Sequence, residues 1–420
     1  MKNCKVKYYF LTFIISLSGW AKQYTYESLL NLAKKNSINQ EIYKTKVIEI
    51  DGRIDHEKSS YYPKLKAIIG SEKIDSGSEP DINESNFVGE IRLDYNLYRF
   101  GGTKDKINSL NALKSEQIKV SEFENKNLER KLEKEYLEGL YFNNYLQILI
   151  SERKFNSQLK KQVSLKRRQG LVGEADVLEI DMREATLKDK ILQNEEHFQH
   201  TLDNIRKLTF LTHEENIEIS GELPHEHFDV KIDELVQAAY KKNLELNRLF
   251  SRIDSINYEL NAKKSDRLPE VNLRARYGKM RIDERYTSNE SLEGLVGIYV
   301  DIPLFDGGMV SSQNKVLISQ LAREKLTLTK SKKNLKIDVL HHYEKMQNVH
   351  KQVDLAEANV SNGEKYFKNV LSEYKRGVKN SIDLVSARDR LMNFKFDLIS
   401  AKRNFLFAKI NLEEVVGVSF

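Results

Sequence analysis

Apolar and polar residues alternate at every second position in four short segments of the chain. The clearest case is segment 87–97, where Phe87, Ile91 and Leu93 fall on one side and Glu90 and Arg92 on the other. Three more segments, beginning near Leu65, Val271 and Val296, have the same period. A period of two predicts β-strands. Polar loops at 71–86 and 280–291 are expected to join these strands in pairs.

A helical pattern covers most of the remaining chain. Segments 26–60 and 232–265 are expected to be helical, and each leads to a proline. Segments 103–169 and 309–376 contain no proline and a single glycine each, so a helix over either would be about 100 Å long. Shorter helices are predicted over 174–209 and 380–414.

The last of these predicted helices carries an apolar repeat of seven residues. Its positions are Leu384, Leu391, Leu398, Phe405 and Leu412. A period of seven is typical of left-handed coiled-coil packing. Each shorter helix is therefore expected to lie beside the long helix that precedes it, forming two helical hairpins.

The same landmarks occur twice in the chain, 206 or 207 residues apart. They are Lys34-Lys35-Asn36 and Lys241-Lys242-Asn243, Tyr62-Pro63-Lys64-Leu65 and Leu268-Pro269-Glu270-Val271, Gly101-Gly102 and Gly307-Gly308, and Gly170 with Asp176 and Gly377 with Asp383. Coincidence explains any single pair, but not four pairs in one order with one offset. The sequence therefore predicts two repeats, 22–225 and 226–420.

The first 21 residues have the features of a secretory signal peptide. Three lysines precede an apolar stretch from Tyr8 to Leu17, and Gly19 and Ala21 are small residues at a cleavage site. The stretch is shorter than the roughly 20 residues that a membrane-spanning helix needs. Removing 1–21 takes away three lysines and no acids, so the net charge falls from +6 to +3. That balance does not favour a nucleic-acid partner.

Strands of about ten residues, apolar on one face and charged on the other, fit either a membrane barrel or a sandwich with one solvated face. The export signal and the long hairpins favour the barrel. The order of helix, proline, strand, loop, strand, double glycine and hairpin, together with Leu304-Phe305-Asp306-Gly307-Gly308 and the two hairpin turns, resembles the TolC family of outer-membrane efflux proteins.

The resemblance implies a mainly α protein with a membrane β-barrel, built from two repeats of two strands and a long helical hairpin. It implies a homotrimer with a twelve-stranded barrel in outer-membrane lipid, an α-helical tunnel in the periplasm, and a mixed belt near 211–230. The function implied is a passive exit duct for efflux or type I secretion. A periplasmic adaptor (membrane fusion) protein, docked on an inner-membrane pump, would open it.

The hairpin turns are the best candidates for functional residues. Gly170 and Gly377 provide the conformational freedom that a turn needs. The resemblance makes Gly170, Val172, Gly173, Gly377, Val378 and Lys379 the adaptor-binding tip. Asp176 and Asp383 would ring the tunnel mouth, or cap the returning helices, or do both. Tyr374 and Lys379 occupy positions where the family holds its closed tip together through polar links.

Enzyme chemistry is not indicated. The sequence has no phosphate-binding loop, dinucleotide-binding glycine pattern or nucleophile elbow. The close histidines, His225-Glu226-His227 and His341-His342, lack an evident set of further ligands, so neither a metal nor another cofactor is expected. Two other classes remain as alternatives: a structural periplasmic coiled-coil protein, and a periplasmic adaptor. The first leaves the alternating strands unexplained, and the second has a single long hairpin.

Overall fold

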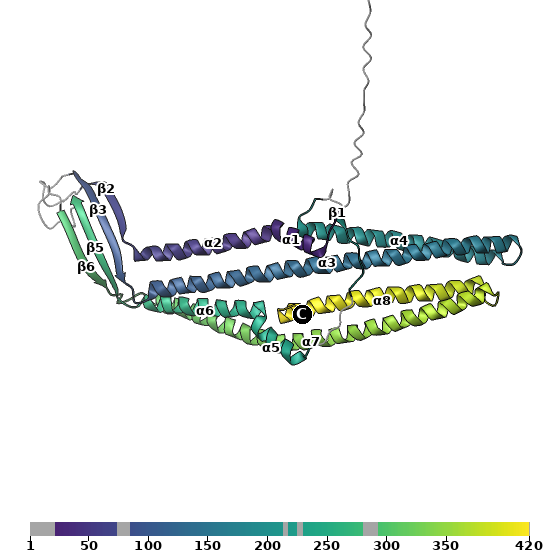
Figure 1. Ribbon diagram of the computed structural model, residues 1–420. Helices are drawn as coiled ribbons and strands as arrows, with labels where there is room; N and C mark the ends of the chain where they lie inside the picture. Colours follow the sequence, from purple (N-terminus) through teal and green to yellow (C-terminus); the bar gives the residue numbers. More distant parts are fainter. Residues whose placement is uncertain (1–21, 74–84, 213–216, 225–229, 280–292, 420) are drawn as a thin grey trace, which may run out of the picture. The chain divides into compact units, whose positions relative to one another are not determined.

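A computed structural model describes residues 22–73, 85–212, 217–224, 230–279 and 293–419. The expected signal peptide (1–21) and most of the two polar loops lie outside the described residues. The elements, in chain order, are β1 (Lys22–Gln23), α1 (Tyr26–Asn36), α2 (Ile38–Lys58), a 3-10 turn (Ser59–Tyr61), β2 (Lys64–Lys73), β3 (Ser85–Tyr98), α3 (Gly102–Arg168), α4 (Glu174–Thr209), β4 (Ile217–Glu218), α5 (Ile232–Lys242), α6 (Leu244–Ser265), β5 (Glu270–Lys279), β6 (Glu293–Asp301), α7 (Met309–Lys375) and α8 (Ser381–Val416) (Figure 1).

The chain divides into two compact units, and each is built from three separate stretches of sequence. The first unit draws on residues within 1–36, 131–225 and 353–403. The second draws on residues within 37–130, 226–352 and 404–420. The first unit therefore contains the two hairpin turns, and the second contains the four-stranded sheet.

The sheet of the second unit has the order β2-β3-β5-β6, with every neighbouring pair antiparallel. Ile91 of β3 lies opposite Ala67 of β2 and Tyr277 of β5, and Leu273 of β5 lies opposite Ile298 of β6. Residues opposite each other in neighbouring strands share a face. The strand segments predicted from the alternating pattern are thus strands of one sheet, in which β2 and β6 are the edges.

The two faces of the sheet differ in polarity, because the register keeps the alternation of all four strands in phase. One face carries Leu65, Ala67, Ile69, Phe87, Ile91, Leu93, Tyr95, Val271, Leu273, Ala275, Tyr277, Val296, Ile298 and Val300. The other carries the charged residues Lys66, Glu90, Arg92, Asp94, Arg274 and Arg276, together with Ile68, Val88, Leu295 and Tyr299. Several apolar side chains are highly exposed, with Ile69 and Val296 at 75% and Ile298 at 68%. In water such a face would be costly, so it requires an apolar environment.

The double glycines stand where the sheet meets the long helices. Gly101 has a φ of +82°, which a residue with a side chain rarely adopts. A Cβ at Gly102 would lie 2.2 Å from the Ser265 hydroxyl oxygen, so a larger residue there would force the Ser265 side chain at the end of α6 to move. Just before the second double glycine, Asp306 caps α7: the backbone N–H groups of Val310 and Gly308 donate to its carboxylate and hold its pKa below the ordinary value.

Two predicted helical stretches are each interrupted once. Segment 26–60 forms α1 and α2, and segment 232–265 forms α5 and α6. Ser37 is the N-cap of α2, and its hydroxyl accepts a hydrogen bond from the N–H of Gln40. Asn243 is the N-cap of α6, and its side-chain oxygen accepts from the N–H of Leu246 at 3.1 Å. A new N-cap offers the backbone an alternative to continuing the previous helix.

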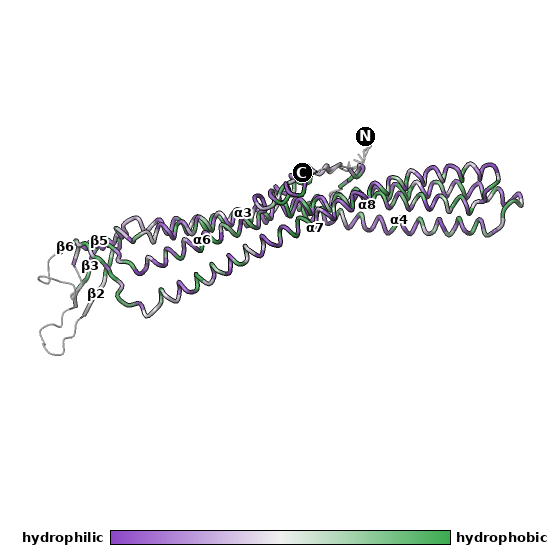
Figure 2. The backbone as a smooth tube through the Cα atoms, turned by 90° about the horizontal axis from the view of Figure 1, so that it is seen from below, coloured by the Kyte–Doolittle hydropathy of each residue, from purple (hydrophilic) through white to green (hydrophobic). Residues whose placement is uncertain are grey.

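The first unit packs helix against helix. The long helices have mixed surfaces, and Figure 2 shows hydrophobic and hydrophilic positions interleaved along them. Leu159, Val163 and Ile180 from α3 and α4 form one core cluster with Val370, Leu384 and Val385 from α7 and α8. Leu149, Leu187, Met392 and Phe396 form a second. Among the described residues, no helix combines the length and the hydropathy needed to cross a membrane.

Candidate functional site

Each long helical hairpin turns at a glycine in the left-handed conformation. We call α3–α4 hairpin one and α7–α8 hairpin two. Gly170 has a φ of +74° and Gly377 a φ of +80°. In hairpin one, the N–H of Leu171 donates to the carbonyl of Lys166, and the N–H of Gly170 donates to the carbonyl of Arg167. In hairpin two, the N–H of Val378 donates in the same way to the carbonyl of Glu373, and the N–H of Gly377 to that of Tyr374. This is the Schellman arrangement, which satisfies the last carbonyls of a helix and favours glycine at its centre.

The two predicted aspartates cap the returning helices. Asp176 Oδ2 accepts a hydrogen bond from the N–H of Gly173 at 3.2 Å. Asp383 Oδ2 accepts from the N–H of Asn380 at 3.2 Å, and Asn380 Oδ1 accepts in return from the N–H of Asp383 at 2.8 Å. A carboxylate at this position also interacts favourably with the positive end of the helix dipole. The six-residue spacing from the glycines therefore has a local structural cause at both turns.

The second oxygen of Asp176 joins the two hairpins. The Ser381 hydroxyl, at the start of α8, donates to Asp176 Oδ1 at 2.5 Å. Ser381 is buried, with 4% exposed. A charge-assisted bond of this kind is stronger than one between neutral groups. The start of α4 is thus tied to the start of α8 within one subunit, and Ser381 is a contact residue that the repeat spacing did not indicate.

The remaining predicted tip residues divide between buried and exposed positions. Tyr374 is buried in the cluster around Leu159, and within the described residues its hydroxyl has no hydrogen-bond partner. The Lys166 ammonium lies 4.3 Å from the centre of its ring. Val172 packs half-buried against the same cluster. Gly173, Val378 and Lys379 are exposed at the turns.

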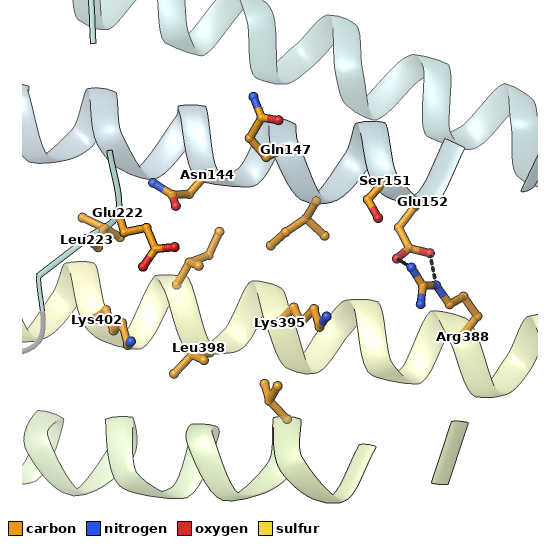
Figure 3. Close-up of a pocket in the computed structure, with 13 residues that line it drawn as sticks. Asn144, Gln147, Ser151, Glu152, Glu222, Leu223, Arg388, Lys395, Leu398 and Lys402 are labelled. Carbon is orange, nitrogen blue, oxygen red and sulfur yellow. Dashed lines mark hydrogen bonds and ion pairs between the residues drawn. The ribbon is translucent and has the colours of Figure 1, made fainter. Parts of the chain in front are cut away.

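A buried group of ion pairs holds hairpin one to hairpin two above the turns. We call it the clasp, and its members are Glu152 and Asn156 of α3, Arg183 of α4, and Arg388 and Asp389 of α8. The side chains of Glu152 and Arg183 are 2% and 6% exposed. Glu152 and Arg388 point toward each other from α3 and α8 (Figure 3). Arg388 donates to both carboxylate oxygens, at 2.7 and 2.9 Å.

Arg183 completes the clasp from α4. It contacts Glu152 at 3.2 Å and Asp389 at 2.6 Å, and it donates to Asn156 Oδ1 at 3.3 Å. The clasp thus pairs two arginines with two carboxylates, of which Glu152 is buried and Asp389 is 38% exposed. Such pairing is required because an unpaired charge in the interior is very costly.

Aromatic rings enclose the Arg388 guanidinium. Its central carbon lies 4.9 Å from the ring centre of Phe155 and 5.0 Å from that of Phe367, one ring from each hairpin. The planar guanidinium suits this position, since it can stack on rings while its edge binds a carboxylate. The sequence held one signal for this site: Arg388 follows Leu384 by four residues and precedes Leu391 by three, so a charge flanks the apolar seam.

A cavity of about 420 Å³ lies beside the clasp, between α3 and α8 (Figure 3). Its walls include Asn144, Gln147, Glu222, Lys395 and Lys402. Both lysines are already ion-paired, with Glu364 at 3.2 Å and Glu357 at 3.4 Å. In the part of the chain that the structure describes, no three His, Cys, Asp or Glu side chains gather closely enough to hold a metal ion. His225-Glu226-His227 lies outside the described residues.

Comparison with known proteins gives one family. Residues 235–418 match the family model described as outer membrane efflux protein. The chain is 25% identical over 181 residues to the alkaline protease secretion protein AprF of Pseudomonas aeruginosa, covering 43% of this chain and 38% of that protein. It is 24% identical over 255 residues to the outer membrane protein TolC of Escherichia coli, covering 54% and 50%. The matches thus span half or less of these relatives.

Solved structures resemble the chain over nearly its whole length. The outer-membrane channel OprN superimposes with a TM-score of 0.78 at 14% identity, covering 93% of this chain and 89% of that one. The CmeC outer membrane channel of Campylobacter jejuni gives a TM-score of 0.76 at 12% identity, covering 99% and 93%. The chain therefore has the fold of these channels.

Proposed function

We propose that the chain is one subunit of a trimeric exit duct, a TolC-like protein of the outer membrane that extends into the periplasm. The match of residues 235–418 to the outer membrane efflux protein family and the similarity to TolC support this proposal. The observation that carries this proposal is the two-faced sheet. Its apolar face is exposed on all four strands, and its charged face is continuous from β2 to β5. The apolar face would contact lipid and the charged face would line the lumen.

The sheet edges support three copies. Strands β2 and β6 each lack a second neighbour in the sheet of the described residues. Open edges are not tolerated in lipid, because each unpaired backbone group there costs several kcal/mol. Three subunits with four strands each would close a twelve-stranded barrel by pairing β6 of one copy with β2 of the next. The helical hairpins of the two repeats, 22–225 and 226–420, would then form a tunnel in the periplasm.

The duct would be a passive channel rather than an enzyme. Its partners would be a periplasmic adaptor and, through it, the inner-membrane pump of an efflux or type I secretion system. AprF is a secretion protein by name, and the likeness to it supports the secretion system as well as efflux.

We place the closed gate at the hairpin turns. Asp176 and Asp383 would narrow the tunnel mouth, each appearing three times in the trimer. The exposed Lys379 would form polar links at the closed tip, and so would Tyr374 once its hydroxyl, which is buried and has no partner among the described residues, turns outward. Adaptor binding would open the tip by favouring the arrangement in which these links are absent.

The test is assembly and conductance of the full-length protein. We expect it in the outer-membrane fraction as a trimer that dissociates into monomers only on heating, and as a channel in planar lipid bilayers. A structural periplasmic protein would instead appear in the soluble periplasmic fraction and would leave bilayer conductance unchanged. That result would overturn the proposal.

A further inference from the structure

Exposed apolar side chains lie next to both edge strands of the sheet, at the end where the sheet meets the helices. Leu304 and Phe305, which follow β6, are 92% and 89% exposed. Tyr61 and Tyr62, which precede β2, are 49% and 68% exposed. Strands β3 and β5 lie between β2 and β6 in the sheet, so the two groups do not cover each other within one subunit.

The two β-hairpins of the sheet have the same register, which identifies equivalent positions in the two repeats. Lys64 lies opposite Asp94 in β2–β3, and Glu270 lies opposite Asp301 in β5–β6. Positions of β2 therefore correspond to positions of β5 at an offset of 206, and positions of β3 correspond to positions of β6 at an offset of 207. The other pairs that both hairpins contain follow the same offsets.

The pairing of β3 with β5 joins the two repeats inside the subunit, and we call it the internal seam. We call the expected pairing of β6 with β2 of the partner subunit the outer seam. In the internal seam, Leu93 lies opposite Ala275. The equivalent positions are Val300 and Ile69, so the same register would place Val300 opposite Ile69 of the partner subunit. Both residues are on the exposed apolar face, at 58% and 75% exposed.

Ion pairs close the internal seam at its helical end. Arg99, which follows β3, pairs with Asp266 at 2.9 Å and with Glu270 at 2.8 Å. The register of β3 shifts between Asn96 and Tyr98, so beyond this point the offset is 206, as it is for the double glycines. The outer-seam equivalents of Arg99, Asp266 and Glu270 are Phe305, Ser60 and Lys64. The outer seam therefore cannot form these ion pairs.

We propose that Leu304 and Phe305 pack on Tyr61 and Tyr62 of the partner subunit, and that this apolar contact replaces the Arg99 ion pairs in the outer seam. The inference rests on the proposed function, in which β6 of one subunit pairs with β2 of the next. Arg99 bridges residues 266 and 270, and the equivalent residues, 60 and 64, flank the two tyrosines. Side chains that one subunit leaves exposed on each edge are thereby buried in the trimer.

The replacement of arginine by phenylalanine also suits the charges of the outer seam. An arginine at position 305 would lie beside Lys64 of the partner subunit, and like charges that face each other across two strands are destabilising. Phe305 avoids this repulsion and packs against aromatic rings instead. The two seams thus share a register but differ in chemistry: the internal seam is ion-paired and the outer seam is apolar.

A double-mutant cycle on the full-length trimer tests the contact. Phe305→Ser and Tyr62→Ser should each lower the temperature at which the trimer dissociates in detergent, and the combined decrease should be smaller than the sum of the two. The matched control is Leu268→Ser, which changes the position of the internal seam equivalent to Tyr62. Its effect should add fully to that of Phe305→Ser. If Phe305 and Tyr62 contact only lipid, their effects should also add fully, and that result would overturn the proposal.

Disulfide formation tests the register of the outer seam. The only natural cysteine, Cys4, is replaced by serine in every variant. After oxidation, Val300→Cys with Ile69→Cys should give covalent trimers that a thiol reductant dissociates. The matched controls combine Val300→Cys with Ala67→Cys or with Ser71→Cys. In the proposed register these pairs are diagonal neighbours about 7–8 Å apart, beyond the usual span of a disulfide, and should give on the order of tenfold less covalent trimer.

A control pair that cross-links as well as the pair of Val300 and Ile69, or better, would overturn the register and with it the proposed contact. So would the absence of any cross-link in a trimer that conducts in a planar bilayer. In both cases the conducting trimer would leave the proposed duct intact. A preparation that forms no trimer and does not conduct would refute the duct itself.

Discussion

Replacing Glu152 by glutamine is the sharpest test of the clasp. The substitution keeps the size of the side chain but removes a carboxylate that accepts two bonds from Arg388, at 2.7 and 2.9 Å, and contacts Arg183 at 3.2 Å. Arg183 keeps Asp389, whereas among the described residues Arg388 keeps only the faces of Phe155 and Phe367.

The expected cost is large because a charge would be left without its partner in the interior. Removing one member of a buried ion pair typically costs about 3–5 kcal/mol. Because the amide oxygen of glutamine can still accept a hydrogen bond from Arg388, we expect a cost near the lower end, about 3 kcal/mol. Since about 1.4 kcal/mol changes an equilibrium constant tenfold, local opening of α8 should become roughly 100-fold more frequent.

Hydrogen exchange of α8 amides 384–392 in the full-length trimer measures this opening. The matched control is Glu357→Gln, which breaks the pair with Lys402 at 3.4 Å, where the side chains are 44% and 21% exposed. An exposed pair contributes about 0–1 kcal/mol, so in the Glu357→Gln variant the exchange rate of the α8 amides should change less than about fivefold. If both variants changed the exchange rates by the same small factor, the stabilising role of the clasp would be refuted. In a double-mutant cycle with Arg388→Gln, the combined cost should be smaller than the sum of the single costs.

Three further predictions concern the sheet and the turns. Ile298→Lys, on the exposed apolar face, should cost about 2–4 kcal/mol and reduce trimer yield, whereas Arg276→Gln on the other face should be mild; equal tolerance would contradict the barrel. Replacing Asp176 and Asp383 by alanine should weaken cation selectivity and block by multivalent cations in a planar bilayer, and unchanged values would leave these residues as helix caps only. Tyr374→Phe should raise resting conductance while leaving the stability of the isolated hairpins within about 0.5 kcal/mol, because its hydroxyl has no partner within the described subunit; a stable variant with unchanged conductance would remove Tyr374 from the gate.

The hydrophobic period of the sequence was sufficient to predict the strands and the long helices. The alternation of segment 87–97 places Ile91 and Arg92 on opposite faces, and the register of β3 confirms this. The same reasoning treated segments 26–60 and 232–265 as continuous. Each contains an N-cap residue, Ser37 or Asn243, whose side chain competes locally with the helical hydrogen bonds. The hydrophobic period is averaged over several helical turns, so it does not reveal a break at a single residue.

The clasp could not be predicted in the same way. Glu152 and Arg388 are 236 positions apart, and the seven-residue repeat specifies which face of each helix is apolar, but not which charges meet across two hairpins. The hydrogen bond from Ser381 to Asp176 could not be predicted for the same reason, since it joins residues 205 positions apart. Local chemistry explained the turn glycines and aspartates, because their partners lie within a few residues.

The contacts between the two hairpins also bear on how a duct of this kind would open. Spreading them inside one subunit would separate the clasp, the Ser381–Asp176 bond and the cluster that Leu159 and Ile180 share with Val370 and Leu384. Exposing each buried aliphatic side chain costs roughly 1.5–3 kcal/mol, so we expect a duct to open by movement between subunits and not by spreading the hairpins of one subunit. A disulfide between Asp176→Cys and Ser381→Cys tests this directly, because Cys4 is the only natural cysteine. The oxidised and reduced forms of this variant should conduct equally with an adaptor present. Loss of adaptor-dependent conductance on oxidation alone would show that the hairpins must separate within the subunit.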